Sequence, residues 1–255
     1  MNVLIFVAPA FRRHIKKRDE KMIFNETPVR TSKNFKINNI SIEDLELPTD
    51  KKEFKNRNIY INTGKDVLLY GETIEDSTRL NDIYEDDKVF VSELNDNSFN
   101  LTYEINKEID DSIKKLVNQP LKIVVKENCS NANVSIDFCF DDENDCLIDN
   151  IEIIAEKNSR IDLTINYIPK VMYDKFVSKK SNDNDTIIVG SVEDNNKYFH
   201  RGILKFKCME ESVVNVTVIN LLNNYSCNIL SVDNNSAENS NLNFNIIDFG
   251  GKISL

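Results

Sequence analysis

The residues of this chain best suited to nucleophilic chemistry are its histidines and cysteines. Only two histidines occur, His14 and His200, so a Ser/His/Asp or Cys/His site within the patterned half of the chain would have to use His200 as its base. His200 lies in Tyr198-Phe-His-Arg-Gly202, at the start of an alternating apolar run. A histidine in such a place packs more often than it catalyses. The sequence therefore predicts a packed or surface strand residue at His200, and no catalytic residue.

Five cysteines are present, and their number and spacing limit what they can form. They are Cys129, Cys139, Cys146, Cys208 and Cys227. The number is odd and no pair has the C-x-x-C spacing, which argues against a zinc site or a disulfide framework and favours reduced cytoplasmic thiols. Cys208 follows Leu204 and Phe206 at a spacing of two, so we expect it to point inward as a small apolar residue rather than as a sulfur or iron ligand. Cys129 and Cys227 lie near expected turns and should be more reactive, although the sequence places no cationic partner beside them.

An acidic cluster offers the other candidate site. Asp141, Asp142, Glu143 and Asp145 could suggest calcium, but the spacing is not that of an EF-hand loop and no glycine stands at the required bend. A solvated acidic turn is the better interpretation. Paired carboxylates on an outward face would also suit a polysaccharide enzyme, against which stands the absence of tryptophan.

Phosphate-binding motifs are missing. The chain has six glycines, none between Gly71 and Gly190, and contains neither G-x-x-x-x-G-K-[ST] nor G-x-G-x-x-G. The sequence thus predicts a protein that is not an enzyme, with no identifiable cofactor-binding or metal residue.

Charge and length exclude further classes. The net charge of −10 does not suit nucleic-acid binding, and the one dense basic run, residues 12–18, lies outside the patterned region. Val3 to Phe11 is apolar but too short to span a bilayer, and its basic residues follow rather than precede it, unlike a secretory signal. We expect a cytoplasmic protein that contacts neither nucleic acid nor membrane. Residues 1–26 stay unassigned, and Met22 is an alternative start.

Alternation of apolar and polar residues dominates residues 121–255. In Ile151–Tyr167 the apolar side chains of Ile161, Leu163, Ile165 and Tyr167 fall on one face of a strand, after a turn at Asn158-Ser159. The same unit recurs three more times. The inward positions expected there are Leu121, Ile123, Val125, Val134, Ile136, Phe138, Phe140, Leu204, Phe206, Val214, Val216, Val218, Leu242, Phe244 and Ile246. A strand–turn–strand unit that cannot bury its own apolar face must stack, so we predict a mainly β fold of the solenoid type.

Residues 27–120 are expected to form a small α+β region before this β core. Ile59–Ile61 and Val67–Tyr70 read as a hairpin, and apolar residues from Ile105 to Val117 have helical spacing that Pro120 ends. A polar stretch from Lys179 to Asn196, with a short strand at residues 187–189, is expected to be an insertion between strands.

Several segments resemble, in order, the SufB/SufD family of iron–sulfur cluster assembly proteins. They are Thr27-Pro-Val-Arg-Thr31 followed by Phe35-Lys-Ile-Asn-Asn-Ile-Ser41, then Asp149 to Tyr167, then Phe199-His-Arg-Gly-Ile-Leu-Lys205, and then Asp248-Phe-Gly-Gly-Lys-Ile-Ser254. The resemblance implies a right-handed parallel β-helix behind a small N-terminal domain, and a scaffold role in cluster assembly with a transient iron–sulfur cluster. It also implies two partners, a SufC-like ABC ATPase and a SufB/SufD-like subunit.

The chain departs from the family in two ways. The tryptophan expected after Pro-Val-Arg-Thr is replaced by Ser32-Lys-Asn, and the sequence stops at Leu255, where family members continue through further strands and the helices that dock SufC. The family's cluster-building cysteine and histidine lie in that later part, so no such role passes to Cys208, Cys227 or His200. We expect a truncated SufD-like core, a split gene product or a paralogue, with a homodimer through its C-terminal β edge. The alternatives are a solenoid interaction module without the cluster role and a β-helix polysaccharide-active enzyme.

Overall fold

The computed structural model describes residues 22–24, 40–42, 47–55, 58–62, 67–69, 82–94, 114–174, 194–251 and 253–254. The chain divides into two compact units, residues 1–51 with 97–117 and residues 52–96 with 118–255. In the first unit, β1 (Met22–Phe24) pairs antiparallel with β2 (Ile40–Ile42). The expectations for His14, the basic run, most of the helix from Ile105 and the strand at residues 187–189 fall outside the described residues. Everything below concerns the second unit, which we call the core unit.

The core unit is mainly β and contains two mixed sheets, neither of them closed. Sheet I has the strand order β14-β12-β10-β8-β3-β4 and sheet II the order β15-β13-β11-β9-β7-β6-β5. The strands of sheet I are β3 (Ile59–Asn62), β4 (Val67–Leu69), β8 (Ala132–Phe140), β10 (Arg160–Pro169), β12 (Val213–Asn220) and β14 (Asn241–Asp248). Those of sheet II are β5 (Asp82–Glu85), β6 (Val89–Glu93), β7 (Gln119–Val125), β9 (Cys146–Ala155), β11 (Phe199–Cys208), β13 (Cys227–Ser236) and β15 (Ile253–Ser254).

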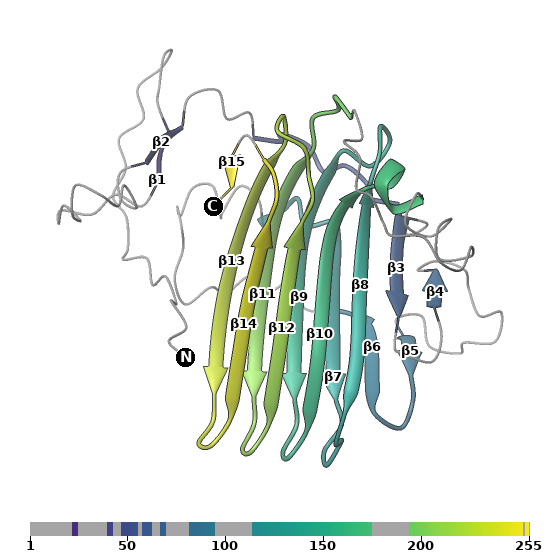
Figure 1. Ribbon diagram of the computed structural model, residues 1–255, viewed down its shortest axis with the longest axis vertical. Helices are drawn as coiled ribbons and strands as arrows, with labels where there is room; N and C mark the ends of the chain where they lie inside the picture. Colours follow the sequence, from purple (N-terminus) through teal and green to yellow (C-terminus); the bar gives the residue numbers. More distant parts are fainter. Residues whose placement is uncertain are drawn as a thin grey trace, which may run out of the picture. The chain divides into compact units, whose positions relative to one another are not determined.

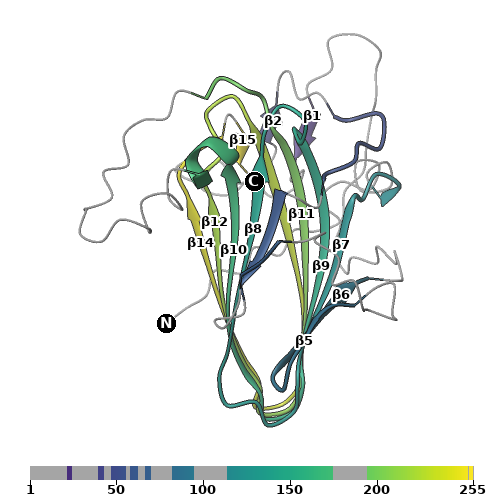
Figure 2. The same cartoon turned by 90° about the vertical axis from the view of Figure 1, so that its right-hand side faces the viewer.

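From β7 onward the chain alternates between the two sheets. Each strand pairs in parallel with the strand two places along the sequence, as β8 with β10 and β10 with β12, or β9 with β11 and β11 with β13. Figure 1 shows these strands as a row of near-parallel ribbons, and Figure 2 shows them as two layers that meet at one end. The register is unbroken along each pair, so residues that share a face in one strand lie beside residues of the same face in the next.

The space between the sheets is filled by the alternating apolar residues. The predicted inward residues from β7 through β12 are all buried, and Phe138 and Tyr167 stack with ring centroids 5.6 Å apart. Each buried Ile, Leu, Val or Phe contributes roughly 1.5–3 kcal/mol of transfer free energy. The alternation predicted from the sequence is therefore confirmed for these strands.

Four turns from sheet II to sheet I share one conformation. Each has a residue with positive φ that is not glycine, namely Asn128, Asn158, Glu211 and Asn239. In three of them the next residue is a serine whose hydroxyl donates to the carbonyl three residues earlier, as from Ser159 Oγ to Glu156 O at 2.6 Å. Asparagine tolerates the left-handed region well, which explains its recurrence in the turns.

The two ends of the strand rows differ. At the N-terminal end the first parallel strands carry antiparallel neighbours: β3 pairs with β8 and β4 with β3, while β6 pairs with β7 and β5 with β6. The expected hairpin is thus present, with Ile61 opposite Leu68, but its hydrogen bonds continue into the core sheet. At the C-terminal end β14 forms the edge of sheet I, and its Ile246 is 57% exposed.

Candidate functional site

His200 lies between the two sheets at the heart of a buried polar cluster. Its Nε2 is 2.7 Å from Asp149 Oδ1 on the adjacent strand, and its Nδ1 contacts Asn228 Oδ1 on the next one. The Tyr167 hydroxyl, from the opposite sheet, donates to Asp149 Oδ2 at 3.1 Å. The four residues come from β9, β10, β11 and β13, so the cluster ties together strands of both sheets.

Packing closes this cluster to solvent. The His200 side chain is fully buried, and its ring lies 3.7 Å from that of Tyr167, centroid to centroid. Gly202 makes room for it, since a Cβ there would lie 2.8 Å from His200 Nε2. Burial, together with the Asp149 carboxylate, raises the pKa of Tyr167 well above its ordinary value. The predicted packed strand residue is what the structure shows, in a position that no substrate can reach without opening the sheets.

The other side of sheet II carries a second group of buried polar residues. Arg201 is fully buried and donates from Nη1 to Gly202 O at 2.7 Å and from Nη2 to Ser231 Oγ at 3.0 Å. Asn150, also fully buried, has an amide with no hydrogen-bond partner within the described part of the chain. Such groups are uncommon in folded proteins, and a buried water often meets their requirement.

The five thiols are free and buried. Burial raises the pKa of Cys146 to about 11 and that of Cys227 to about 12, and it also raises the pKa of Cys139 and Cys208. Cys208 points inward as predicted. The expectation that Cys227 is reactive because it lies near a turn is wrong, because β13 begins at Cys227 and its side chain is covered. Cys129 stands in the first turn where the later turns have serine, and it is likewise buried.

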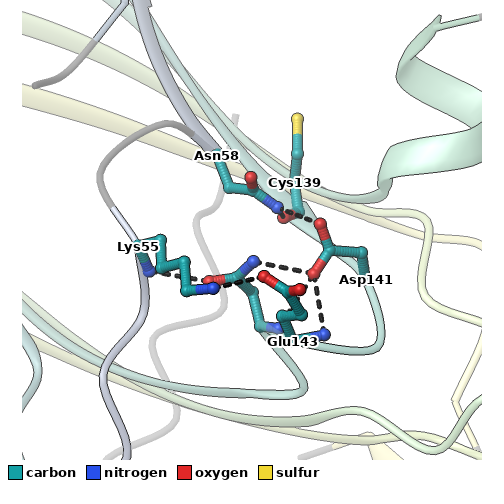
Figure 3. Close-up of polar contacts among 6 residues, drawn as sticks. Lys55, Asn58, Cys139, Asp141 and Glu143 are labelled. Carbon is teal, nitrogen blue, oxygen red and sulfur yellow. Dashed lines mark hydrogen bonds and ion pairs between the residues drawn. The ribbon is translucent and has the colours of Figure 1, made fainter. Parts of the chain in front are cut away.

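The acidic loop after β8 is a structural connection rather than a freely solvated turn. Asp141 accepts hydrogen bonds from Asn58 Nδ2 at 2.6 Å and from Asn144 Nδ2 at 2.7 Å (Figure 3). Asn58 Nδ2 also donates to Cys139 O at 2.8 Å. Burial alone would raise the pKa of Asp141, but the hydrogen bonds donated by Asn58 and Asn144 outweigh it and lower the pKa below its ordinary value.

Two ion pairs extend this connection. Lys55 pairs with Glu143, and Lys52 pairs with Asp145 at 2.6 Å. They join the segment before β3 to the loop after β8, 88 and 93 residues later in the sequence. The fourth acidic residue, Asp142, accepts a hydrogen bond from Asn196, 54 residues later, so all four acidic residues contact distant segments of the chain.

An open pocket of about 850 Å³ lies beside this loop. It has a buried aromatic wall of Phe140 and Tyr198, and Tyr198 donates its hydroxyl to Asp194 at 2.8 Å. Carboxylates outnumber the single cation, Lys170, among its lining residues. The pocket favours cationic over anionic occupants by charge alone.

The sequence analysis did not identify the hydrogen-bond partners in these clusters. Asp149, Tyr167 and Asn228 lie 18 to 51 residues from the groups they bond, and nothing in their local sequence marks them. The stacking order β9, β11 and β13 is what brings them together, so a prediction would have needed the register as well as the periodicity.

Among the described residues, no group of three or more His, Cys, Asp or Glu side chains is arranged to hold a metal ion. No described helix is long and apolar enough to cross a membrane. Comparison with protein-family models, curated proteins and solved structures gives no match.

Proposed function

We propose that this chain is a non-enzymatic, cytoplasmic β-solenoid scaffold of the SufB/SufD type, acting in iron–sulfur cluster assembly. The observation that supports it best is the path of the chain, which alternates between two sheets while each strand stacks in parallel on the strand two places before it. A coiled path of this kind is what a parallel β-helix requires.

Three of the four segments that resemble the family fall on this path, and the first, residues 27–41, lies almost wholly outside the described residues. Asp149–Tyr167 covers most of β9 and β10, the segment from Phe199 covers the first part of β11, and the segment from Asp248 runs from the end of β14 to β15. In this proposal nucleotide hydrolysis belongs to a SufC-like ATPase partner, and iron and sulfide are cargo rather than resident cofactors.

Co-purification tests the proposal. The full chain, expressed with a SufC-type ATPase and a SufB/SufD-like subunit from the same source, should retain at least one of them through gel filtration. Anaerobic addition of iron and sulfide to that complex should produce visible absorbance that the separate chains do not give. If neither partner is retained and no absorbance appears, the cluster role has no support.

The burial of the thiols favours a second candidate, a solenoid interaction module without the cluster role. All five cysteines are buried and the pKa is raised for four of them, so thiolate ligands are costly to form in this conformation. Retention of a partner subunit without any cluster-dependent absorbance would select this module over the assembly scaffold.

A further inference from the structure

The hydrogen bonds of His200 determine which protonation state of its ring fits the core. Nε2 lies 2.7 Å from Asp149 Oδ1, and Nδ1 contacts Asn228 Oδ1. Both facing atoms are acceptors, because an ionised carboxylate and an amide oxygen have no proton to donate. A neutral imidazole has a single N–H, so in that form one of the two contacts would set two lone pairs against each other. The imidazolium ion donates to both atoms and satisfies both contacts.

The groups around the ring also suit a positive charge. The Tyr167 hydroxyl donates to Asp149 Oδ2 at 3.1 Å, which favours the ionised carboxylate as the counter-ion. The Tyr167 ring lies 3.7 Å from the imidazole, centroid to centroid, and the faces of aromatic rings attract cations. Phe140 of β8 and Leu230 of β13 are apolar neighbours. Among the described residues, the titratable groups that face His200 are therefore Asp149 and Tyr167.

These contacts depend on the strand register. His200 is level with Asn228 of β13. Asp149 of β9 is level with Gly202, two residues further along β11. A shift of β13 by two residues would keep its side chains on the same face, so the alternation of apolar and polar residues does not forbid it. Such a shift would set Leu230 opposite His200 in place of Asn228, and Nδ1 would lose its acceptor. Fixing a register is the best-attested use of a buried polar or ionic group.

We propose that His200 is a buried imidazolium ion whose bonds to Asp149 and Asn228 form a proton-dependent lock on the register of sheet II. While both ring protons are present, β9, β11 and β13 are held in one register, and Tyr167 ties that register to sheet I. Removal of one proton sets an acceptor against an acceptor inside the core, which costs the desolvation of an unpaired buried polar group. The strands then lose this restraint on slipping. The lock does not depend on the proposed role in cluster assembly.

The direction of the pH dependence follows from counting protons. An unfolded histidine is largely neutral above about pH 7. The folded chain therefore binds one proton more than the unfolded chain above that pH, so stability falls as the pH rises. This group should lower the folding equilibrium constant by about tenfold per pH unit, until His200 loses its second proton in the folded state. The buried thiols add a slope of the same sign above about pH 8, because unfolded cysteines begin to ionise there.

Nuclear magnetic resonance of the ring nitrogens tests the protonation state directly. His14→Gln leaves His200 as the single histidine of the full chain. With isotope-labelled nitrogen at about pH 8, where a free histidine is neutral, both ring nitrogens should show the chemical shift of a protonated nitrogen and a coupling to a bonded hydrogen. One protonated and one unprotonated nitrogen would overturn the lock, because His200 would then be neutral.

Urea unfolding of the full chain between about pH 7 and pH 8 tests the consequence. Asp149→Asn removes the counter-ion but keeps the shape, so His200 should become neutral and its part of the pH slope should vanish. Tyr167→Phe is the matched control, because it removes one hydrogen bond to Asp149 but keeps the ion pair, and it should keep the slope. An equal slope in the wild type and Asp149→Asn contradicts the lock, and so does loss of the slope in Tyr167→Phe. If Asp149→Asn does not fold, the resonance measurement decides by itself.

Discussion

The N-terminal and C-terminal ends of the core unit finish the same strand rows in opposite ways. At the N-terminal end short antiparallel strands cover β7 and β8, and the acidic loop is bonded to the segment before β3. At the C-terminal end β14 continues the parallel row and leaves its apolar face half open, with Phe249 74% exposed just beyond it. A repeated unit produces a surface that can always accept one more copy, so closing the row requires residues that depart from the repeat.

Charge insertion in the middle of the row should have the largest effect. Ile165 is fully buried in β10, between Ile136 and Val218, so Ile165→Asp buries an unpaired carboxylate. The cost is of the order of the whole stability of a domain, about 5–15 kcal/mol, and we expect no soluble protein. Thr164→Asp, on the outer face next to it, should change the free energy of unfolding in urea by less than about 1 kcal/mol.

The same substitution at the open end sharpens the comparison. Ile246→Asp should yield soluble, folded protein because that side chain is already 57% exposed. Circular dichroism and soluble yield would show the difference. If Ile246→Asp, like Ile165→Asp, gives no soluble protein, the C-terminal end of the strand rows is closed in solution.

The middle of the row is the part that the sequence predicted well. Period-two alternation marks the inward residues of β7 to β12 because a strand has only two faces, and both the sheet partners and the turns repeat with it. The same pattern in Leu242, Phe244 and Ile246 predicted burial, which the structure shows only in part, because burial needs a following strand and alternation does not report one.

The contacts within the two clusters could not be predicted from the sequence, for a related reason. The Asn58–Asp141 contact spans 83 positions and the His200–Asp149 contact spans 51, and neither pair has a spacing typical of a motif. The sequence separation of each pair depends on the lengths of the strands and loops between its two residues. Gly202 beside His200 was the one local sign, and it becomes meaningful only once the ring is known to lie against it.

Loss of the Asn58 side chain should destabilise the N-terminal end of the strand rows, where short antiparallel strands cover β7 and β8. Asn58 is 2% exposed and donates to both Asp141 and the Cys139 carbonyl, so Asn58→Ala removes both of these hydrogen bonds, although Asp141 still accepts from Asn144. The substitution should lower the free energy of unfolding by about 1–3 kcal/mol. Urea unfolding measures it, and hydrogen exchange should rise first in β3 and β8. Asp142→Ala, whose side chain accepts one exposed hydrogen bond, should cost less than about 0.5 kcal/mol. Equal losses from both substitutions would mean that the loop does not hold this end.

Low pH should destabilise the same N-terminal end, because Asp141 takes part in these contacts. Because hydrogen bonds lower the folded-state pKa of Asp141 below its unfolded value of about 3.9, its stabilising contribution is present above that pH and is lost as the pH falls through the folded-state pKa. Hydrogen exchange in β3 should therefore accelerate below about pH 4, whereas exchange in β12 should be less affected. Asp141→Asn should remove most of this acid dependence. An unchanged profile in that variant would assign it to another carboxylate.

The smallest expected effect concerns the turns, which do not distinguish the ends. Glu211 has φ of 61°, while the equivalent residues Asn128, Asn158 and Asn239 are all asparagine. Glu211→Asn should raise the free energy of unfolding by about 0.5–1 kcal/mol, because asparagine is less strained in the left-handed region. The reverse change, Asn239→Glu, should cost a similar amount at the open end even though few neighbours surround it, because the strain belongs to the residue's own backbone. If Asn239→Glu lowers the free energy of unfolding by much less than Glu211→Asn raises it, the last turn relaxes when it is unsupported. The C-terminal end would then adjust in its backbone as well as in its packing.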